Sequence, residues 1–410
     1  MTDTLKARDA KDVENAVQGA LGEGRALEVL GHGSKRLIGR PLRTDLALDL
    51  SALSGIILYE PEELVLSAKA GTPLAEIEAL VAGKGQHLAF EPMDCGQLTG
   101  GPIGRGTIGG TIAANLCGPR RITAGAARDH LLGFSAVSGR GETFKSGGRV
   151  VKNVTGYDFC KLMAGSWGTL AVLTEVTVKT LPKPETEATV VVSGLDDAAA
   201  MRAMTAAMGS ACEVSGAAHL PAAAAARFPM GAPVAAGGAL TALRLEGVAP
   251  SVAQRRAALQ AALRPHGETA MIDDMVSRRL WMAIRDVAAF ASSRAGGDQP
   301  LWRISTAPTK GCELAARVTG EIEAEVLYDW AGGLVWLATP AATEAAASLV
   351  RAAVRAVGGH ATLVRAPAWL RAAVDVFEPP EGGLAALTKR VKEGFDPKGV
   401  LNPGRMWARV

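Results

Sequence analysis

Three glycine-rich turns in the N-terminal half of the chain constrain its fold more than any other feature. They read GHGSKR at 31–36, GRGTIGG at 104–110 and GSWGT at 165–169, and each joins segments with strand or helix periodicity. Glycine lets the backbone approach a ligand closely, and consecutive exposed N–H groups bind phosphate. Any one of these turns by itself is as well explained by a tight connection. Three of them in one α+β region predict a cradle for a dinucleotide.

The middle turn also contains the spacing G-x-G-x-x-G, at Gly104, Gly106 and Gly109. That spacing is typical of a Rossmann fold where it ends a buried strand, opens a helix and precedes an acidic residue about 20 positions later. The preceding residues, FEPMDCGQLTGGPIG, cannot form a buried strand, and Asp129 precedes an apolar segment instead of ending one. The sequence therefore favours a non-Rossmann site, with Thr107 capping a helix whose start would suit an anionic group.

Charge and composition exclude several classes of protein. The net charge of +3 is not gathered in basic runs with interleaved aromatics, so nothing predicts nucleic-acid binding. No stretch of about 18 strongly apolar residues predicts a membrane span, and the charged N-terminus does not resemble a secretory signal. The five cysteines show no C-x-x-C spacing, which argues against zinc, iron–sulfur ligation and a disulfide framework. We expect reduced thiols, no metal site and a cytoplasmic protein.

The chain is predicted to contain two α+β domains and a C-terminal segment. Residues 1–182 alternate short strands and helices, and the proline-rich stretch PKPETE at 182–187 predicts a linker. From 188 to 375 a strand followed by a helix recurs four times, which suits a smaller, ferredoxin-like cap of helices on an antiparallel sheet. Residues 376–410 form a separate segment that contains FDPKGVLNPGRMW.

The order of the motifs resembles one family of flavoproteins. GHGSK, GRGTIGGTIAANLCG, RDHLLGFSAV and GGRVVKNVTGYDFCKLMAGSWGTLAVLTEVTVKTLP follow one another as in the vanillyl-alcohol-oxidase (PCMH) type of FAD-binding domain. The similarity is greatest to the FAD-binding subunits of glycolate oxidases, of the E type, and runs essentially from end to end, including GGHATLVRA at 358–366. The resemblance implies an α+β fold with a two-subdomain PCMH-type FAD-binding domain followed by the ferredoxin-like cap.

The resemblance also implies which residues contact FAD. The GHGSK turn and TIGG would contact the pyrophosphate, Asn115 and Gly118 would line the flavin side, GTLAV would pass the adenosine half, and Asn402 would return to the flavin. The cofactor-binding residues expected on this basis are Gly31, His32, Gly33, Ser34, Lys35, Thr107, Ile108, Gly109, Gly110, Asn115, Gly118, Gly168, Thr169, Val172 and Asn402. Some relatives bond FAD covalently through a histidine directly before the serine of the first turn. Here Gly33 intervenes, so we expect noncovalent FAD and an exposed turn histidine.

The catalytic residues are less well indicated. Flavin oxidation of a 2-hydroxy acid needs a base for the hydroxyl proton and a cation for the carboxylate. Family members that do this carry an H-G-x-G-N-x-H type of segment late in the second domain, whereas no two of the six histidines here lie close together in sequence. The weak candidates are His360 and Arg365, which are equally well explained as a strand-edge histidine and a surface charge.

Two functional hypotheses follow, and the missing histidine segment favours the first. In the first, a separate catalytic FAD subunit oxidises glycolate to glyoxylate, and this chain holds a second FAD. An iron–sulfur subunit then passes the electrons to the respiratory chain. We expect such a complex in the cytoplasm or peripherally at the inner membrane. In the second, the chain is a self-sufficient FAD-dependent 2-hydroxy-acid dehydrogenase of the D-lactate type. A third hypothesis, a structural subunit without flavin, ranks last. Such a subunit would have lost the glycine-rich turns, which are present here.

Overall fold

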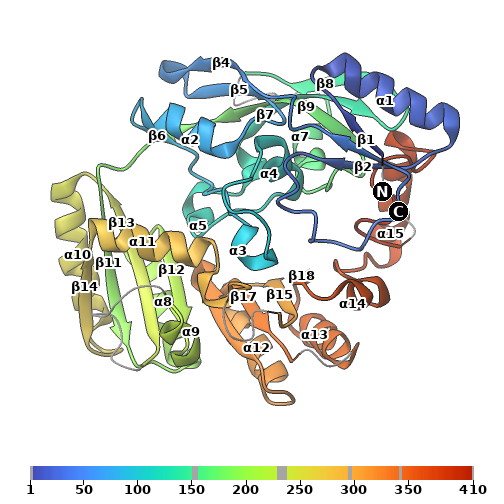
Figure 1. The fold of residues 1–410 in the computed structure, drawn as a ribbon. Coiled ribbons are helices and arrows are strands. Elements are labelled where there is room, and N and C mark those ends of the chain that lie inside the picture. The colour runs from blue at the N-terminus through green and yellow to red at the C-terminus, as the bar shows by residue number, and fades with distance from the viewer. Residues whose placement is uncertain (1–2, 150–155, 229–237, 294–297, 341–343, 409–410) are drawn as a thin grey trace.

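The computed structural model describes residues 3–149, 156–228, 238–293, 298–340 and 344–408. Helices and strands alternate throughout, which confirms the predicted α+β class (Figure 1). An N-terminal part runs to Pro182, and a second part, here called the cap, extends from Thr186 to Arg365. The rest of the chain, the C-terminal segment, returns to the N-terminal part. Of the motif KNVTGYD at 152–158, residues 152–155 lie outside the described residues.

Two larger sheets and one two-stranded sheet form the described N-terminal part. A parallel sheet has the order β1-β3-β2, an antiparallel one has the order β4-β5-β9-β7-β8, and β6 pairs with β10. The strands are β1 (Asp3–Lys6), β2 (Leu27–Leu30), β3 (Leu46–Asp49), β4 (Ile56–Glu60), β5 (Val65–Lys69), β6 (Gln86–His87), β7 (Leu131–Ser138), β8 (Thr143–Gly147), β9 (Ala171–Lys179) and β10 (Leu181–Pro182).

Helices connect and cover these sheets. The sequence sets both ends of the first helix. At its start Asp9 accepts a hydrogen bond from the backbone of Asp12, and at its end Gly24 adopts the left-handed conformation with a φ of 66°. Its buried residues join one core with Val137 of β7 and Val172 of β9. The helices are α1 (Ala10–Glu23), α2 (Leu74–Ala82), α3 (Gly96–Thr99), α4 (Ile108–Ala114), α5 (Arg121–Ala124), α6 (Ala127–His130) and α7 (Phe159–Met163).

The cap is one antiparallel sheet built from two similar halves. Strands β11 to β14 follow a βαββαβ path with the spatial order β14-β11-β13-β12, and β15 to β18 repeat it as β16-β17-β15-β18. The second strands of the halves, β12 and β16, pair at His219 and Tyr328 and join the halves. The predicted ferredoxin-like cap is therefore confirmed and is doubled, because the four strand–helix repeats supply two ferredoxin-like units.

The cap elements alternate regularly along the chain. Its strands are β11 (Thr186–Ser193), β12 (Gly216–Leu220), β13 (Leu240–Gly247), β14 (Thr269–Asp273), β15 (Leu301–Ser305), β16 (Glu325–Asp329), β17 (Leu334–Ala338) and β18 (His360–Arg365). Its helices, with those of the C-terminal segment, are α8 (Asp197–Met208), α9 (Ala222–Ala226), α10 (Ala249–Leu263), α11 (Asp274–Arg285), α12 (Gly311–Thr319), α13 (Glu344–Val357), α14 (Ala368–Ala373) and α15 (Gly382–Phe395). The predicted boundaries of the domains remain a proposal.

The two faces of the cap sheet bury different surfaces. On one face Val190 and Leu243 pack with residues of α8, α10 and α12, while on the other Val191 and Trp336 join the core of the N-terminal part. Successive strand residues point to opposite faces, so each strand contributes to both cores. The second face positions β15, β17 and β18 against the N-terminal part.

The C-terminal segment is fixed to the N-terminal part by a buried cation. In the last turn of α15, the Lys392 ammonium donates hydrogen bonds to the carbonyls of Thr169 (2.6 Å) and Leu401 (3.2 Å) and to the Asp396 carboxylate (2.7 Å). Leu401 then pairs in parallel with Leu27 of β2. This contact brings Asn402 to the end of β2.

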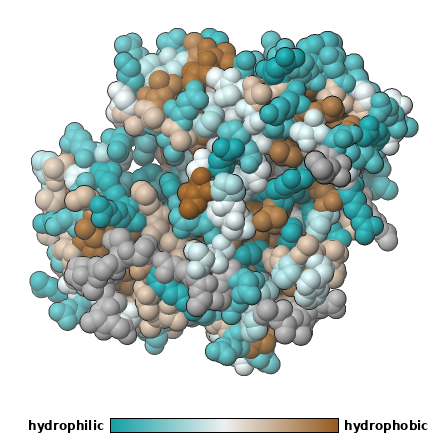
Figure 2. Space-filling view, in the orientation of Figure 1, coloured by the Kyte–Doolittle hydropathy of each residue, from teal (hydrophilic) through white to brown (hydrophobic). Residues whose placement is uncertain are grey.

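The face of the molecule seen in Figure 2 is a mosaic of hydrophilic and apolar residues. Among the described helices, none has both the length and the apolar composition needed to cross a membrane.

Candidate functional site

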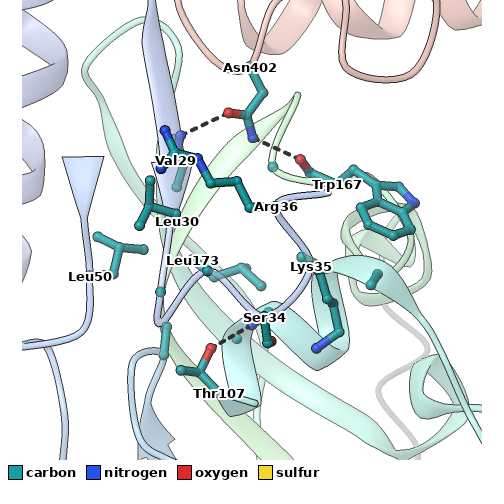
Figure 3. A pocket seen from close by; sticks show the side chains of 18 of the residues that line it. Val29, Leu30, Ser34, Lys35, Arg36, Leu50, Thr107, Trp167, Leu173 and Asn402 are labelled. Carbon is teal, nitrogen blue, oxygen red and sulfur yellow. Dashed lines mark hydrogen bonds between the residues drawn. The ribbon is translucent and has the colours of Figure 1, made fainter. Parts of the chain in front are cut away.

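The three glycine-rich turns meet around one cavity of about 110 Å³ (Figure 3). The first turn follows β2, the second opens α4 and the third precedes β9. Ten of the predicted cofactor-binding residues line this first cavity, namely Gly31, His32, Gly33, Ser34, Lys35, Thr107, Gly109, Gly110, Gly168 and Asn402. The structure thus brings together segments that lie far apart in sequence.

The first turn offers unpaired backbone donors. Among the described residues, no group accepts a hydrogen bond from the N–H groups of residues 31–35, and Gly33 has a positive φ of 74°. Backbone N–H groups that face a cavity need an acceptor, and successive ones form a concave site for an anion. A pyrophosphate group supplies acceptors of this kind.

The N–H groups at the start of α4 form hydrogen bonds within the chain. The N–H groups of Ile108, Gly109 and Gly110 donate to Thr72 O, Ala70 O and Thr107 Oγ1, at 3.0, 2.9 and 3.2 Å. These three donors already have partners within the chain, and the predicted contact of TIGG with the pyrophosphate remains a prediction. What this turn provides is a bare backbone surface.

Two neighbouring glycines of this turn are needed for different reasons. A Cβ on Gly109 would lie 2.7 Å from the Cβ of Ala70, so this glycine is required for the contact of α4 with the strand end behind it. A Cβ on Gly110 would meet only Thr107 Oγ1, at 3.1 Å, and Gly110 lines the cavity. A larger side chain at Gly110 would therefore project into the space that the cavity leaves for a ligand.

Positive charge surrounds the first turn. Lys35 lines the cavity, and Arg405, which the sequence analysis missed, donates from Nη2 to the Lys35 carbonyl at 2.7 Å. Burial lowers the pKa of Arg405 to about 10, so its guanidinium is still charged at neutral pH. Its buried Nε has no hydrogen-bond partner among the described residues. Arg405 lies directly after LNPG, and its place beside the first turn depends on the fold of the C-terminal segment.

His32 is less exposed than expected. It is half-buried and lines the first cavity, and its buried Nδ1 has no hydrogen-bond partner in the described part of the chain. Burial, with the nearby charge of Arg105, lowers the pKa of its imidazole. The ring is therefore neutral at pH 7, with an unused polar atom at the cavity.

Asn402 closes the first cavity from the C-terminal segment. Its Oδ1 accepts a hydrogen bond from Val29 N (2.8 Å), and its Nδ2 donates to Trp167 O (2.9 Å), as Figure 3 shows. It thereby joins the end of β2 to the third turn. Apolar walls, also missed by the sequence analysis, come from Leu30, Leu50, Ala113, Trp167 and Leu173.

A second cavity, of about 380 Å³, lies where the N-terminal part, the cap and the C-terminal segment meet. It shares Ala114 and Trp167 with the first cavity, so the two adjoin. Asn115 lines this second cavity, and its Oδ1 accepts a hydrogen bond from Arg128 N at 3.0 Å. The charged residues in its lining are Arg121, Arg128, Arg303 and Glu378, and His360 also lines it.

The two weak catalytic candidates are separated by the structure. His360 lines the second cavity at its rim, and partial burial, with the charges of Arg303 and Arg121, lowers its pKa. Arg365 lines neither cavity. Its guanidinium donates to the carbonyls of Gln299, Leu98 and Phe290, at 3.0, 2.9 and 2.6 Å. Arg365 therefore holds loops together, and the prediction of a surface or anion-binding charge is wrong.

Four predicted cofactor residues do not line either cavity. Ala171 and Leu173 face the first cavity, so strand alternation turns the Val172 side chain into the core on the other side of β9. The Gly118 carbonyl accepts a hydrogen bond from Trp330 Nε1 at 3.0 Å and so joins the N-terminal part to the cap. Ile108 is buried in the core, and Thr169 Oγ1 donates to Ser166 O at 2.7 Å.

Comparison with known proteins agrees with this arrangement. Residues 4–147 match the model of the FAD binding domain family. The chain is 32% identical over 406 residues to the glycolate oxidase subunit GlcE of Escherichia coli K12, covering 96% of each chain. The glycolate oxidase subunit GlcD of Bacillus subtilis is 34% identical over 149 residues, which is 36% of this chain and 30% of that protein.

Solved structures share the fold. Alkyldihydroxyacetonephosphate synthase superposes with a TM-score of 0.71 at 16% identity, covering 98% of this chain and 75% of that one. The 4-ethylphenol oxidase of Gulosibacter chungangensis gives 0.70 at 14% identity, covering 98% and 89%. The free N–H groups, the bare Gly110 and the nearby cations fit FAD, the cofactor of this protein. Because its similarity to a full-length relative extends over nearly the whole sequence, the chain belongs to the family of the glycolate oxidase subunit GlcE, a family of FAD-dependent oxidoreductases.

Proposed function

We propose that the chain is the FAD-binding subunit of a glycolate-oxidising complex and that electrons pass through its flavin. The observation that carries this proposal is the first cavity, which is lined by the three glycine-rich turns and Asn402. The chain that contains this cavity is similar to GlcE over 96% of its length. The names of the relatives GlcE and GlcD, both glycolate oxidase subunits, support a complex with more than one flavoprotein subunit.

Each part of the first cavity has a separate role in binding FAD. The free N–H groups of residues 31–35 hold the pyrophosphate, with Lys35 and Arg405 balancing its charge. Gly110 allows the backbone to approach, and Trp167 and Leu173 exclude water from the apolar parts of the cofactor. When bound, FAD supplies the acceptor for the electrons of the reaction. The contacts that hold it are noncovalent.

In the favoured form of the proposal this chain relays electrons. A separate catalytic FAD subunit oxidises glycolate, and an iron–sulfur subunit of the complex, peripheral at the inner membrane, receives the electrons. One observation supports it: no described residue forms a hydrogen bond with the His360 ring. A catalytic base is ordinarily oriented by a further group, and here none fixes the tautomer of the ring.

A second candidate, direct oxidation of a 2-hydroxy acid by this chain, has one observation in its favour. Arg121, Arg303 and His360 line the same cavity, beside the cavity assigned to FAD. These are the side-chain types that a carboxylate clamp and a base require.

Purification of the chain alone and with its partner subunits tests the proposal. The chain alone should carry about one FAD, and glycolate should reduce an artificial acceptor only in the assembled complex. In a complex whose copy of this chain carries Gly110→Val, the FAD occupancy of this chain should fall, and electron transfer to the iron–sulfur subunit should fall with it. Full electron transfer in that flavin-depleted complex would contradict the proposal.

A further inference from the structure

A third cavity, here called the basic groove, lies behind the turn that carries Asn402. Its volume is about 650 Å³, and its lining comes from the loop after β2, from α14, from α15 and from the end of the chain. Pro403 and Gly404 line the groove, whereas Asn402 and Arg405, which flank them in sequence, line the first cavity. The groove therefore adjoins the cavity assigned to FAD without being part of it.

The basic groove concentrates positive charge in a chain whose net charge is only +3. Asp396 Oδ2 accepts a hydrogen bond from Lys392 Nζ at 2.7 Å, and Glu393 lies 3.8 Å from Lys389 Nζ, so both carboxylates of the lining are paired inside the chain. The charged residues of the lining are five cations and these two carboxylates, namely Arg40, Arg43, Lys389, Lys392, Lys398, Glu393 and Asp396. The remaining three cations have no carboxylate within 4 Å among the described residues.

One of these three cations has a structural role, and the other two do not. The Arg40 guanidinium donates to the carbonyls of Val374 and Ala372, each at 3.0 Å, and so fixes the loop after β2 to the end of α14. Arg43 and Lys398 are exposed, and neither side chain forms a hydrogen bond with a described residue. Their charge is therefore available to an anionic group that enters the groove.

The walls of the basic groove are held in place before any ligand binds. Pro41, Pro397 and Pro403 line it, and proline fixes φ, so these loops have little freedom to lose on binding. The buried Asp396 carboxylate accepts hydrogen bonds from the N–H groups of Val400 and Leu401, both at 2.9 Å. The groove is therefore a preformed site.

The shape and lining of the basic groove decide which anion fits. The bases of nucleotides stack on aromatic side chains, and the described lining contains none. A volume of about 650 Å³ exceeds what a single phosphate needs, and a flat bilayer cannot enter a concave site. Trp369 of α14 is 60% exposed and lies three residues before Ala372 of the lining, so it offers an apolar contact at the edge. These features suit a peptide with acidic side chains and an apolar residue.

We propose that the basic groove is the docking site for an acidic segment of a partner protein, with Arg43, Lys389 and Lys398 facing its carboxylates and Trp369 its apolar residue. That the partner is a subunit of the glycolate-oxidising complex rests on the proposed function, whereas the acidic chemistry of the segment rests on the groove alone. Complementary charge steers two proteins together and selects the partner. Docking here places the partner against the turn that separates the groove from the first cavity.

Fluorescence anisotropy of the FAD-loaded chain tests the groove, with a fluorescein-labelled peptide of alternating glutamate and alanine as the probe and its glutamine counterpart as the neutral control. The acidic peptide should bind at one saturable site, most tightly at low ionic strength because salt screens exposed charges. The glutamine peptide should bind much more weakly. Arg43→Glu combined with Lys398→Glu should weaken binding of the acidic peptide by roughly tenfold or more, since it replaces two attractions by two repulsions.

Lys84→Glu combined with Arg264→Glu is the matched control. It changes the net charge by the same amount at two exposed cations that do not line the groove, and α10, which Arg264 follows, lies at the opposite edge of the molecule from α14 and α15 (Figure 1). The control should keep the affinity of the wild-type chain for the peptide. Both double variants should keep the flavin content and the thermal midpoint, because the substituted side chains are exposed. Arg43→Gln combined with Lys398→Gln provides the same test if the charge reversal does not fold.

Association with the purified partner subunits of the complex should weaken in the groove variant and not in the control. Three results would overturn the proposal: no saturable binding of the acidic peptide, equal affinities of the two double variants, or groove-dependent binding to vesicles of anionic lipid by a chain that does not bind the peptide. The last result would assign the groove to a membrane surface.

Flavin content, measured separately, distinguishes this proposal from the proposed function. A chain that carries FAD and whose association with the partner subunits does not depend on the groove would contradict the docking site alone. A chain that carries no FAD but binds the acidic peptide through the groove would contradict the proposed function and leave the docking site standing.

Discussion

The side-chain oxygen of Asn402 lies 2.8 Å from the backbone nitrogen of Val29, although 373 positions separate the two residues. Through the same side chain, Nδ2 of Asn402 donates to Trp167 O at 2.9 Å. Three distant segments therefore meet at one amide group, directly at the first cavity. Asn402 has a φ of 43°, a conformation that asparagine and glycine tolerate better than other residues.

Asn402→Gly should lower both the stability of the protein and its affinity for FAD. Glycine accepts the positive φ, so the variant isolates the loss of two hydrogen bonds, and each polar group left without a partner costs about 1–3 kcal/mol. Urea unfolding and titration with FAD measure the two effects. Asn402→Asp keeps the acceptor for Val29 but places a buried carboxylate oxygen against the Trp167 carbonyl, so it should be destabilised as well. A glycine variant with wild-type stability and affinity would show that the contact is dispensable.

Gly110→Val should weaken FAD binding by roughly tenfold or more, equivalent to about 1.4 kcal/mol. The valine side chain would occupy cavity space, since a Cβ there has only Thr107 Oγ1 within 4 Å. Gly19→Val is the matched control: Gly19 also lies in a helix, α1, and a Cβ there has nothing within 4 Å. Fluorescence titration of FAD compares the two variants. Equal affinities would remove Gly110 from the cofactor site.

FAD should be released when the protein is precipitated with acid. The expected contacts are noncovalent, and at about 100 times its dissociation constant FAD should add roughly 2.7 kcal/mol to the free energy of unfolding. His32 is the candidate for a covalent bond to FAD, because it lines the first cavity and its buried Nδ1 has no hydrogen-bond partner among the described residues. Yellow colour that stays in the pellet of the wild-type protein and leaves it in His32→Ala would demonstrate a covalent bond instead.

Stability should fall as the pH drops from about 6.5 toward 4. Burial, followed by the charge of Arg120, lowers the pKa of His87 from 6.5 to about 4 in the folded protein. Between these values the unfolded chain binds a proton that the folded chain does not, so acid favours unfolding. His87→Gln should reduce this pH dependence by roughly one proton, as measured by urea unfolding at pH 7 and pH 5. An unchanged slope would place the titrating group elsewhere.

The glycine-rich turns could be predicted from the sequence, but the hydrogen bonds of their N–H groups could not. GHGSK, TIGG and GSWGT were recognisable because glycine patterns are local, and the structure brings them together. Whether an N–H group is free depends on distant partners: Gly109 N is taken by Ala70 O, whereas the N–H groups of 31–35 have no acceptor among the described residues. Likewise the alternation of β9 decides that Leu173 and not Val172 faces the cavity.

Arg303 and Arg365 show the same limit. Both are arginines in cap strands, and one motif, GGHATLVRA, drew attention to Arg365. The pairing register of β15 with β17 and β18 directs the Arg303 side chain toward the second cavity. The Arg365 guanidinium instead donates hydrogen bonds to the carbonyls of Leu98 and Gln299. One local signal for Arg303 was present, namely a charge inside the apolar strand LWRIS.

Rapid mixing of the FAD-loaded chain with millimolar glycolate, followed at the flavin absorbance band, tests the proposed division of labour most directly. No described residue forms a hydrogen bond that would orient the His360 ring, and a positioned base contributes about 10²–10⁴-fold to the rate. The flavin of the isolated chain should therefore stay oxidised over seconds, although dithionite reduces it, and should be reduced by glycolate once the partner subunits are added. Reduction of the isolated chain by glycolate within seconds, abolished by His360→Ala, would contradict the relay and establish a self-sufficient dehydrogenase.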